Sequence, residues 1–222
     1  VQKRGYTVAH IKTDSIKIPN ADNEIIEFVM DFGKKYGYTF EHEDTYERMC
    51  LVNDAVYIAK YKNPHKDKKI GKDIWWTATG AQFQHPYVFK TLFSKEKIEF
   101  PDLCEAKSVS TAMYLDMNEQ LPEGNHDYVF IGKTGLFCPI VPGSGGGVLL
   151  RESKDKTKYA AVTGTKDYRW LEAETVKTLK IEDQIDKSYG NSLVDAAIDN
   201  ISKYGDFDRF ASDEPYVELP WD

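Results

Sequence analysis

The chain has 222 residues, of which 41% are hydrophobic and 29% are charged, and its formal net charge is −7. This composition is typical of a globular protein with one large domain or two small ones, and it excludes a disordered or collagen-like chain. No stretch reaches the ~18 consecutive apolar residues that a membrane helix needs, so we expect no membrane partner.

Three cysteines, Cys50, Cys104 and Cys138, are too few and too scattered for a disulfide framework. We expect them to be reduced and largely buried in a cytoplasmic protein. The first residue is Val1, and no apolar segment typical of a signal peptide follows it. We therefore also expect that part of the protein precedes this sequence.

The charge is distributed unevenly. Residues 182–222 hold eleven acidic residues and three basic ones. Two zones are mildly basic: residues 60–90 hold seven lysines against two aspartates, and residues 148–180 hold eight basic residues against five acidic ones. The basic zones are compatible with phosphate contacts, whereas an acidic end is usually a solvated surface.

The first predicted elements are a hairpin and a helix. Residues 6–18 contain two β-rich runs around Lys12-Thr13-Asp14-Ser15, and polar turn formers between such runs predict a β-hairpin. In residues 25–36 the apolar positions share one helical face, which predicts an amphipathic helix. Asp22 or Asn23 is suited to cap its start.

A second hairpin and two helices are predicted next. Residues 48–51 and 55–61 have strand composition with a turn at 53–54, and the lysine-rich residues 62–73 are expected to form a loop. Residues 86–94 and 104–118 are expected to be helical.

The last third of the chain mixes strands with a helix. Residues 141–147 are glycine-rich and predict a hinge or turn. Strands are expected at 148–152 and 158–163, and a helix at 192–204. This order of elements predicts an α+β fold and lacks the regular strand–helix alternation of a doubly wound sheet.

Asp14 is the strongest candidate for a functional residue, as a metal-binding carboxylate. A hairpin tip holds a carboxylate rigidly and outward, and Mg²⁺ binds a few such oxygens together with water and phosphate. Thr13 and Ser15 beside it can hydrogen-bond the backbone or a phosphate. The alternative is that Asp14 and Ser15 only make a turn, because their side chains readily bond to nearby backbone groups.

Other motifs point less clearly to chemistry. The glycines at 145–147 lack the residues of a phosphate-binding loop. The acidic cluster in residues 41–47 lacks metal-ligand spacing and is interpreted as a solvated face. The lysines of 60–72, near Tyr57, Tyr61 and Trp75-Trp76, fit either nucleic-acid binding or a solvated loop beside core aromatics.

The order of these parts resembles the C-terminal palm and thumb of family B DNA polymerases. In that family a palm motif reads Tyr-x-Asp-Thr-Asp-Ser, and here the same six positions are His10-Ile11-Lys12-Thr13-Asp14-Ser15. The second family aspartate, a ligand of the catalytic metals, falls on Asp14. A later family motif ends in a tyrosine that contacts the primer–template minor groove, and residues 52–60 look like it, with Tyr57 on that tyrosine.

The resemblance covers residues 5–100 best. Beyond them, residues 145–152 and 163–170 look like a bacteriophage branch of the family, which implies the cytoplasm of a bacterial host cell. The resemblance implies a palm portion with the metal-binding hairpin over residues 1–75, and a thumb with helices and a small β element over residues 76–222. Its implied contacts to DNA fall on Lys12, Tyr57, Lys60, Lys62, Arg151, Lys158, Lys166 and Arg169.

The implied function is template-directed nucleotidyl transfer with Mg²⁺, primer–template DNA and a deoxynucleoside triphosphate. The sequence departs from the family pattern at two places. Lys12 replaces the first family aspartate, and the lysines of the tyrosine motif are absent. The other metal ligand and the exonuclease and fingers parts do not occur in this sequence, so the chain is not expected to be active alone. The alternative is a non-catalytic nucleic-acid-binding module derived from a degenerate palm and thumb.

Overall fold

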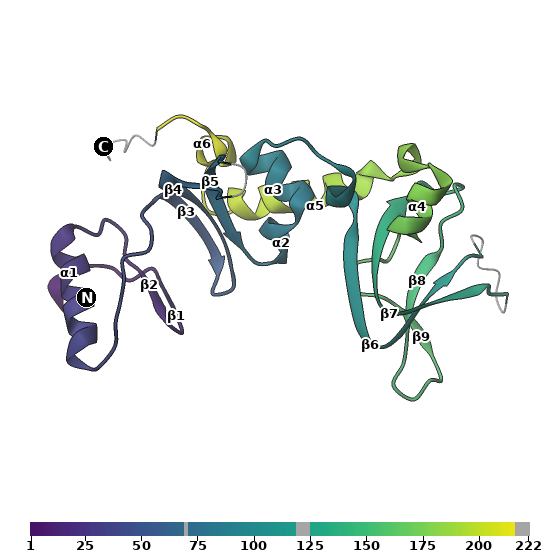
Figure 1. The fold of residues 1–222 in the computed structure, drawn as a ribbon, viewed down its shortest axis with the longest axis horizontal. Helices are drawn as coiled ribbons and strands as arrows, with labels where there is room; N and C mark the ends of the chain where they lie inside the picture. Colours follow the sequence, from purple (N-terminus) through teal and green to yellow (C-terminus); the bar gives the residue numbers. More distant parts are fainter. Residues whose placement is uncertain (69–70, 119–124, 216–222) are drawn as a thin grey trace. The chain divides into compact units, whose positions relative to one another are not determined.

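The computed structural model describes residues 1–68, 71–118 and 125–215, and the chain divides into two compact units. Unit 1 comprises residues 1–84 and the chain from residue 200 onward, and unit 2 comprises residues 85–199 (Figure 1). No helix among the described residues is long and apolar enough to cross a membrane. The proposed palm–thumb boundary at residue 75 stays a prediction.

Unit 1 begins with the predicted hairpin and helix. After a 3-10 turn, η1 (Gln2–Arg4), β1 (His10–Lys12) pairs antiparallel with β2 (Ser15–Lys17), which leaves Thr13 and Asp14 in the turn. Helix α1 (Asn23–Lys35) starts at Asp22, whose side chain accepts a hydrogen bond from the Ile25 N–H. Both elements confirm the prediction, because turn and cap residues act locally.

A three-stranded antiparallel sheet follows, in the order β3 (Tyr46–Asn53), β4 (Val56–Lys66) and β5 (Asp73–Thr79). The predicted β3–β4 hairpin is confirmed. The loop predicted over 62–73 is wrong in its first part, since β4 continues to Lys66 and pairs with β5 there. The pairing shifts between Lys60 and His65, and this irregularity accommodates Pro64 within a strand.

Two short helices complete unit 1: α2 (Ala81–Gln84) and α6 (Phe207–Ala211), the latter capped by the Asp206 carboxylate. One face of the sheet buries Ile58 and Trp76, and the Trp76 ring lies 5.6 Å from the ring of Phe210 in α6. Residues 207–214, which we call the C-terminal segment, therefore pack on this face of the sheet.

Unit 2 has a helical start and a mostly β body. Its helices are α3 (Pro86–Phe89), the π-helical turn η2 (Lys90–Ser94), η3 (Phe100–Leu103), α4 (Ala173–Leu179), η4 (Glu182–Gln184) and α5 (Lys187–Ser202). Its strands are β6 (Glu105–Asp116), β7 (Tyr128–Ile140), β8 (Val148–Glu152), β9 (Tyr159–Ala161) and β10 (Arg169–Glu172). The predicted helix at 86–94 and the predicted strands are confirmed, and α5 begins earlier than expected.

The helix predicted over residues 104–118 is wrong, because this segment forms the long strand β6. Met113 and Leu115 are buried in the core while Tyr114 between them is partly exposed. This alternation has the period of two that belongs to a half-buried strand. The α+β class itself is as expected.

The strands of unit 2 form an antiparallel sheet in the order β10-β7-β6-β8-β9. Gly147, just before β8, exchanges backbone hydrogen bonds of 2.9 and 2.8 Å with Trp170 in β10. The sheet therefore curls into a half-barrel around Phe137, Leu149 and Trp170 (Figure 1). A Cβ on Gly147 would lie 2.8 Å from the Asp116 carbonyl, so this approach requires glycine. The glycine-rich 141–147 segment is a turn at this junction.

Candidate nucleic-acid interface

The β1–β2 hairpin presents Asp14 to solvent. Lys12, Thr13 and Asp14 are exposed at the tip, and Ser15 is half-buried where β2 begins. The two strands pair Lys12 directly with Ser15, so the turn between them is tight. The hairpin thus displays a carboxylate, a hydroxyl and an ammonium group within three consecutive residues.

His10 connects this hairpin to the three-stranded sheet. Its side chain is only 5% exposed, and its Nε2 lies 3.2 Å from the carbonyl oxygen of Asp54 in the β3–β4 turn. The His10 ring also meets the Tyr57 ring edge-on at 6.4 Å. Lys17 in β2 adds a second link, with its Nζ 5.4 Å from the centre of the Tyr46 ring. The β1–β2 hairpin therefore contacts both β3 and β4 of the sheet.

The sheet surface beside the hairpin is rich in tyrosine. Tyr57 and Tyr61 are four residues apart on β4 and share one face of the strand, and Tyr46 on β3 pairs with Tyr61 at a ring distance of 5.5 Å. Tyr61 stacks on His65 at 4.3 Å. Burial, followed by the electrostatic influence of Tyr57 and Tyr61, raises the pKa of the Tyr46 hydroxyl. We call Tyr46, Tyr57 and Tyr61 the tyrosine face.

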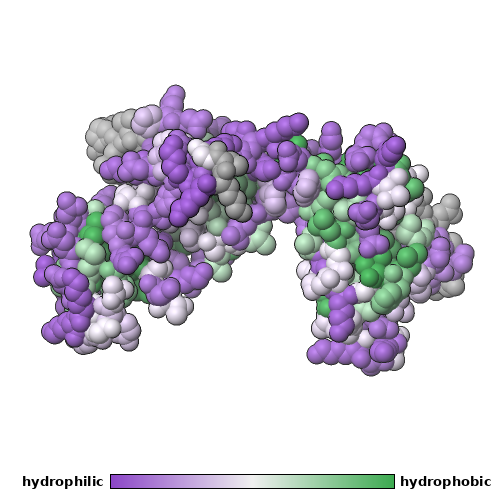
Figure 2. Space-filling view, in the orientation of Figure 1, coloured by the Kyte–Doolittle hydropathy of each residue, from purple (hydrophilic) through white to green (hydrophobic). Residues whose placement is uncertain are grey.

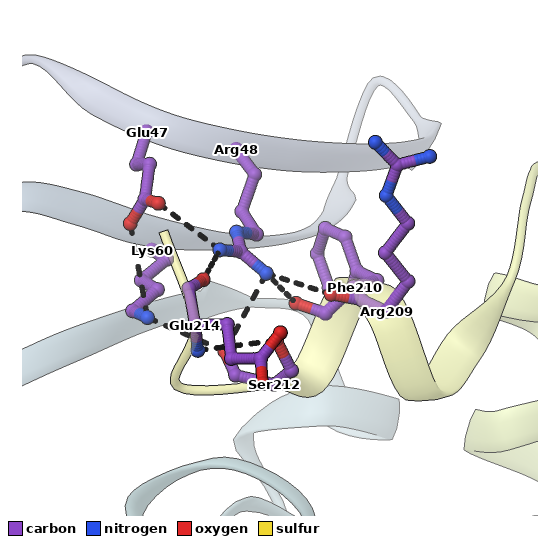
Figure 3. Close-up of polar contacts among 7 residues, drawn as sticks. All are labelled: Glu47, Arg48, Lys60, Arg209, Phe210, Ser212 and Glu214. Atoms are coloured by element: carbon purple, nitrogen blue, oxygen red, sulfur yellow. Dashed lines mark hydrogen bonds and ion pairs between the residues drawn. The ribbon is translucent and has the colours of Figure 1, made fainter. Parts of the chain in front are cut away.

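Lys60 lies on the opposite face of the same sheet. It is three residues from Tyr57, and an odd separation along a strand reverses the side. Lys60 is 5% exposed, and its ammonium lies 3.7 Å from the Glu47 carboxylate and donates a 3.3 Å hydrogen bond to the Ser212 carbonyl (Figure 3). A DNA contact by Lys60 next to Tyr57 does not fit this placement. Lys62 is exposed.

Arg48 organises that opposite face, and sequence analysis did not single it out. Its guanidinium donates hydrogen bonds to the backbone carbonyls of Arg209, Phe210, Ser212 and Glu214, and it also pairs with Glu47 at 3.0 Å (Figure 3). The first two of these carbonyls lie in α6 near its C-terminal end, where backbone carbonyls lack helical partners. The Arg48 cluster fastens the C-terminal segment to the sheet.

The described residues do not contain a complete set of magnesium ligands. None of them forms a group of three or more His, Cys, Asp or Glu side chains suited to a metal. In the acidic cluster of residues 41–47, Asp44 pairs with His65, and Glu47 pairs with Arg48 and Lys60. Asp14 offers Mg²⁺ one carboxylate, so water, phosphate or other parts of the protein would have to supply the remaining oxygens, and the ammonium of Lys12 lies on the same hairpin.

The four cations predicted in unit 2 separate into two sets. Arg151 and Lys158 line a groove of about 660 Å³ between β6, β8 and β9. Lys166 is exposed in the loop before β10, and Arg169 is half-buried within β10. The structure brings only Arg151 and Lys158 together. Beside their groove lies a group of exposed aromatic rings that sequence analysis missed, because it read β6 as a helix.

Comparisons with known proteins give no match: no family model, no curated protein and no solved structure is similar to this chain.

Proposed function

We propose that this chain is the C-terminal palm and thumb portion of a DNA-directed DNA polymerase. The observation that supports the proposal best is the contact of His10 with Asp54 and Tyr57. It joins the exposed Asp14 turn to the tyrosine face within unit 1. A polymerase needs such a combination, because a primer end must be held close to the group that binds the catalytic ions.

The residues of unit 1 then have distinct roles. Tyr57 positions the primer–template, and Lys12 neutralises a phosphate near the hairpin tip. Asp14 contributes one carboxylate, and Thr13 and Ser15 hold the turn. The remaining ligands and the grip on the deoxynucleoside triphosphate come from other parts of the polymerase, so this chain alone does not catalyse template-directed nucleotidyl transfer.

A second candidate is a non-catalytic nucleic-acid-binding module. Lys12 favours it, because a lysine beside Asp14 places a positive charge where a dication would otherwise bind. In this case the tyrosine face binds the duplex and Asp14 serves only as a turn residue.

Primer extension by the longest natural polypeptide that contains this chain distinguishes the two candidates. We expect extension that requires template, deoxynucleotides and Mg²⁺, and that falls by several orders of magnitude in Asp14→Ala. The matched control is Asp31→Ala, since Asp31 is an exposed carboxylate on α1 that pairs only with Lys34 among the described contacts. The control is expected to extend primers normally.

Undiminished extension by Asp14→Ala would remove Asp14 from the active site. Absence of extension by every variant, with duplex binding intact, would favour the non-catalytic module.

A further inference from the structure

The outer face of the unit 2 sheet bears a cluster of aromatic side chains. Tyr114 on β6 pairs directly with Phe130 on β7, and Tyr128 and Tyr159 lie on β7 and β9. The neighbours of Tyr114, Met113 and Leu115, are buried in the core. By strand alternation Tyr114 and its partners face outward. We call Tyr114, Tyr128, Phe130 and Tyr159 the aromatic cluster.

The rings of this cluster are ordered and accessible. Tyr128 stacks on Tyr159 with ring centres 4.7 Å apart, and His126 stacks on Tyr128 at 5.1 Å. Tyr114 meets Phe130 and Tyr159 edge-on, each at 5.4 Å. Tyr128 is 38% exposed, Tyr159 40% and Phe130 65%. Large aromatic rings gathered and open to solvent are unusual unless they bind something. Hydrophobic residues also reach the surface over the strands of unit 2 (Figure 2).

Asp116 holds the residues that precede Tyr128, at one end of the aromatic cluster. Its carboxylate is buried, lies 2.6 Å from Nδ1 of His126 and accepts a 3.0 Å hydrogen bond from the Asp127 N–H. These bonds hold His126 where it stacks on Tyr128. The rings are therefore arranged before any ligand arrives, which lowers the entropic cost of binding.

Positive charge lies across the β8–β9 edge of the sheet from these rings. Arg151 pairs directly with Met113 of the core, so strand alternation places its side chain on the face opposite to Tyr114. Tyr159 also lines the groove of about 660 Å³, together with Arg151, Lys154 and Lys158. All three cations are exposed, and no ion pair is formed by them among the described contacts. The acid in the adjoining turn, Asp155, is occupied by hydrogen bonds from Thr157 and Ser153, and Glu152 is the one acidic residue lining the groove.

We propose that the aromatic cluster and this groove bind single-stranded nucleic acid. Unstacked bases pack on Phe130 and Tyr159, whereas the ring of Tyr128 is already stacked on His126 and Tyr159. The strand passes around the β8–β9 edge, where Arg151, Lys154 and Lys158 contact its phosphates. A duplex does not fit this arrangement, because its bases are stacked on one another and do not present their faces. An apolar protein surface would leave the exposed Arg151, Lys154 and Lys158 without anionic partners, whereas the phosphates of a nucleic acid strand supply them. This inference concerns unit 2 and goes beyond the function proposed for unit 1.

Fluorescence anisotropy with the whole chain tests the proposal. The probes are labelled oligo-dT and oligo-rU of roughly 16 nucleotides, the upper site size of comparable single-strand binders, and a DNA duplex of the same length. We expect both single strands to bind, with the comparison of dT and rU showing whether DNA or RNA is preferred. Tyr159→Ala and Phe130→Ala should each weaken single-strand binding about tenfold, since each removes a stacking surface.

Matched variants separate stacking from damage to the fold. Tyr159→Phe keeps the ring and should bind as the parent does, and Tyr38→Ala, which removes a tyrosine that is 66% exposed in unit 1, should have no effect. Lys158→Glu should weaken binding and reduce the salt dependence of the affinity, with a slope smaller by roughly 0.7 for each lost phosphate contact. Lys97→Glu, an exposed lysine of unit 2 outside the groove, is its control.

Three results would overturn the proposal: no binding of either single strand at low salt, equal binding by the parent and both alanine variants, or tighter binding of the duplex than of the single strands through the same residues. Failure of the polymerase proposal is recognised separately, because it depends on primer extension and on Asp14, which lies in unit 1.

Discussion

Arg48 places a charged group inside unit 1, where its side chain is 6% exposed, and four backbone carbonyls of the C-terminal segment depend on it. Removing one partner of such a buried network leaves polar groups without hydrogen bonds. We expect Arg48→Met to lower the free energy of unfolding of unit 1 by about 3 kcal/mol. Arg48→Lys should also be destabilising, since an ammonium cannot reproduce the fork of a guanidinium. Urea unfolding of both variants measures the change.

Lys34→Met is the control for Arg48→Met. Lys34 forms an ion pair with Asp31 at 3.0 Å on the exposed side of α1, and such surface pairs contribute less than about 1 kcal/mol. Equal urea midpoints for the Arg48→Met and parent chains would show that the C-terminal segment is not held by Arg48.

The residue scale also shows why part of the candidate site was not predictable. Asp14 and Tyr57 belong to short motifs, so their positions on hairpins follow from local sequence. Lys60 was grouped with Tyr57 by its nearness in sequence, although alternation along β4 separates their side chains. The partners of Arg48 lie more than 160 residues away, and no local pattern connects them.

At the level of elements, β6 ends on a buried carboxylate that holds the connection to β7. Burial by itself would raise the pKa of Asp116, but hydrogen bonds from the Asp127 N–H, His126 and the Asn118 N–H outweigh it and lower the pKa. A pKa that is lower in the folded chain stabilises it above the unfolded value of about 3.9, and this contribution is lost as the pH falls through that value toward the folded pKa.

Replacing this carboxylate tests its contribution. We expect Asp116→Asn to lower the stability of unit 2 at pH 7 by about 1–3 kcal/mol, and to lose less stability than the parent between pH 5 and pH 3. Urea unfolding across this pH range gives both values, with Asp127→Asn as an exposed neighbouring control. An unchanged pH profile in Asp116→Asn would contradict the role of this carboxylate.

The elements differ in how far sequence predicts them. The β1–β2 turn and the cap of α1 depend on residues within a few positions, and both are predicted correctly. In contrast, the strand conformation of β6 is stabilised by pairing with β7 on one side and with β8 on the other. Such long-range pairing overrides the weak helical pattern of residues 104–118. The aromatic cluster was missed for the same reason, since it exists only once β6, β7 and β9 are adjacent.

On the scale of the whole molecule, the two proposed surfaces lie in different compact units: the tyrosine face in unit 1 and the aromatic cluster in unit 2. The chain has a net charge of −7, so a general positive field does not attract nucleic acid to it. Binding must therefore come from local features, and each surface should respond to its own substitutions.

This separation predicts independent effects. Tyr57→Ala should weaken binding of a primer–template duplex and leave oligo-dT binding unchanged, while Tyr159→Ala should do the reverse. In the double variant, the binding free energy for each probe should fall by the same amount as in the corresponding single variant. Substitutions without shared partners add within about 0.5 kcal/mol. Anisotropy titrations of the four chains with both probes at one salt concentration measure the two free energies. A coupling larger than this margin, or a loss of duplex binding in Tyr159→Ala, would mean that a single continuous surface binds both forms of nucleic acid.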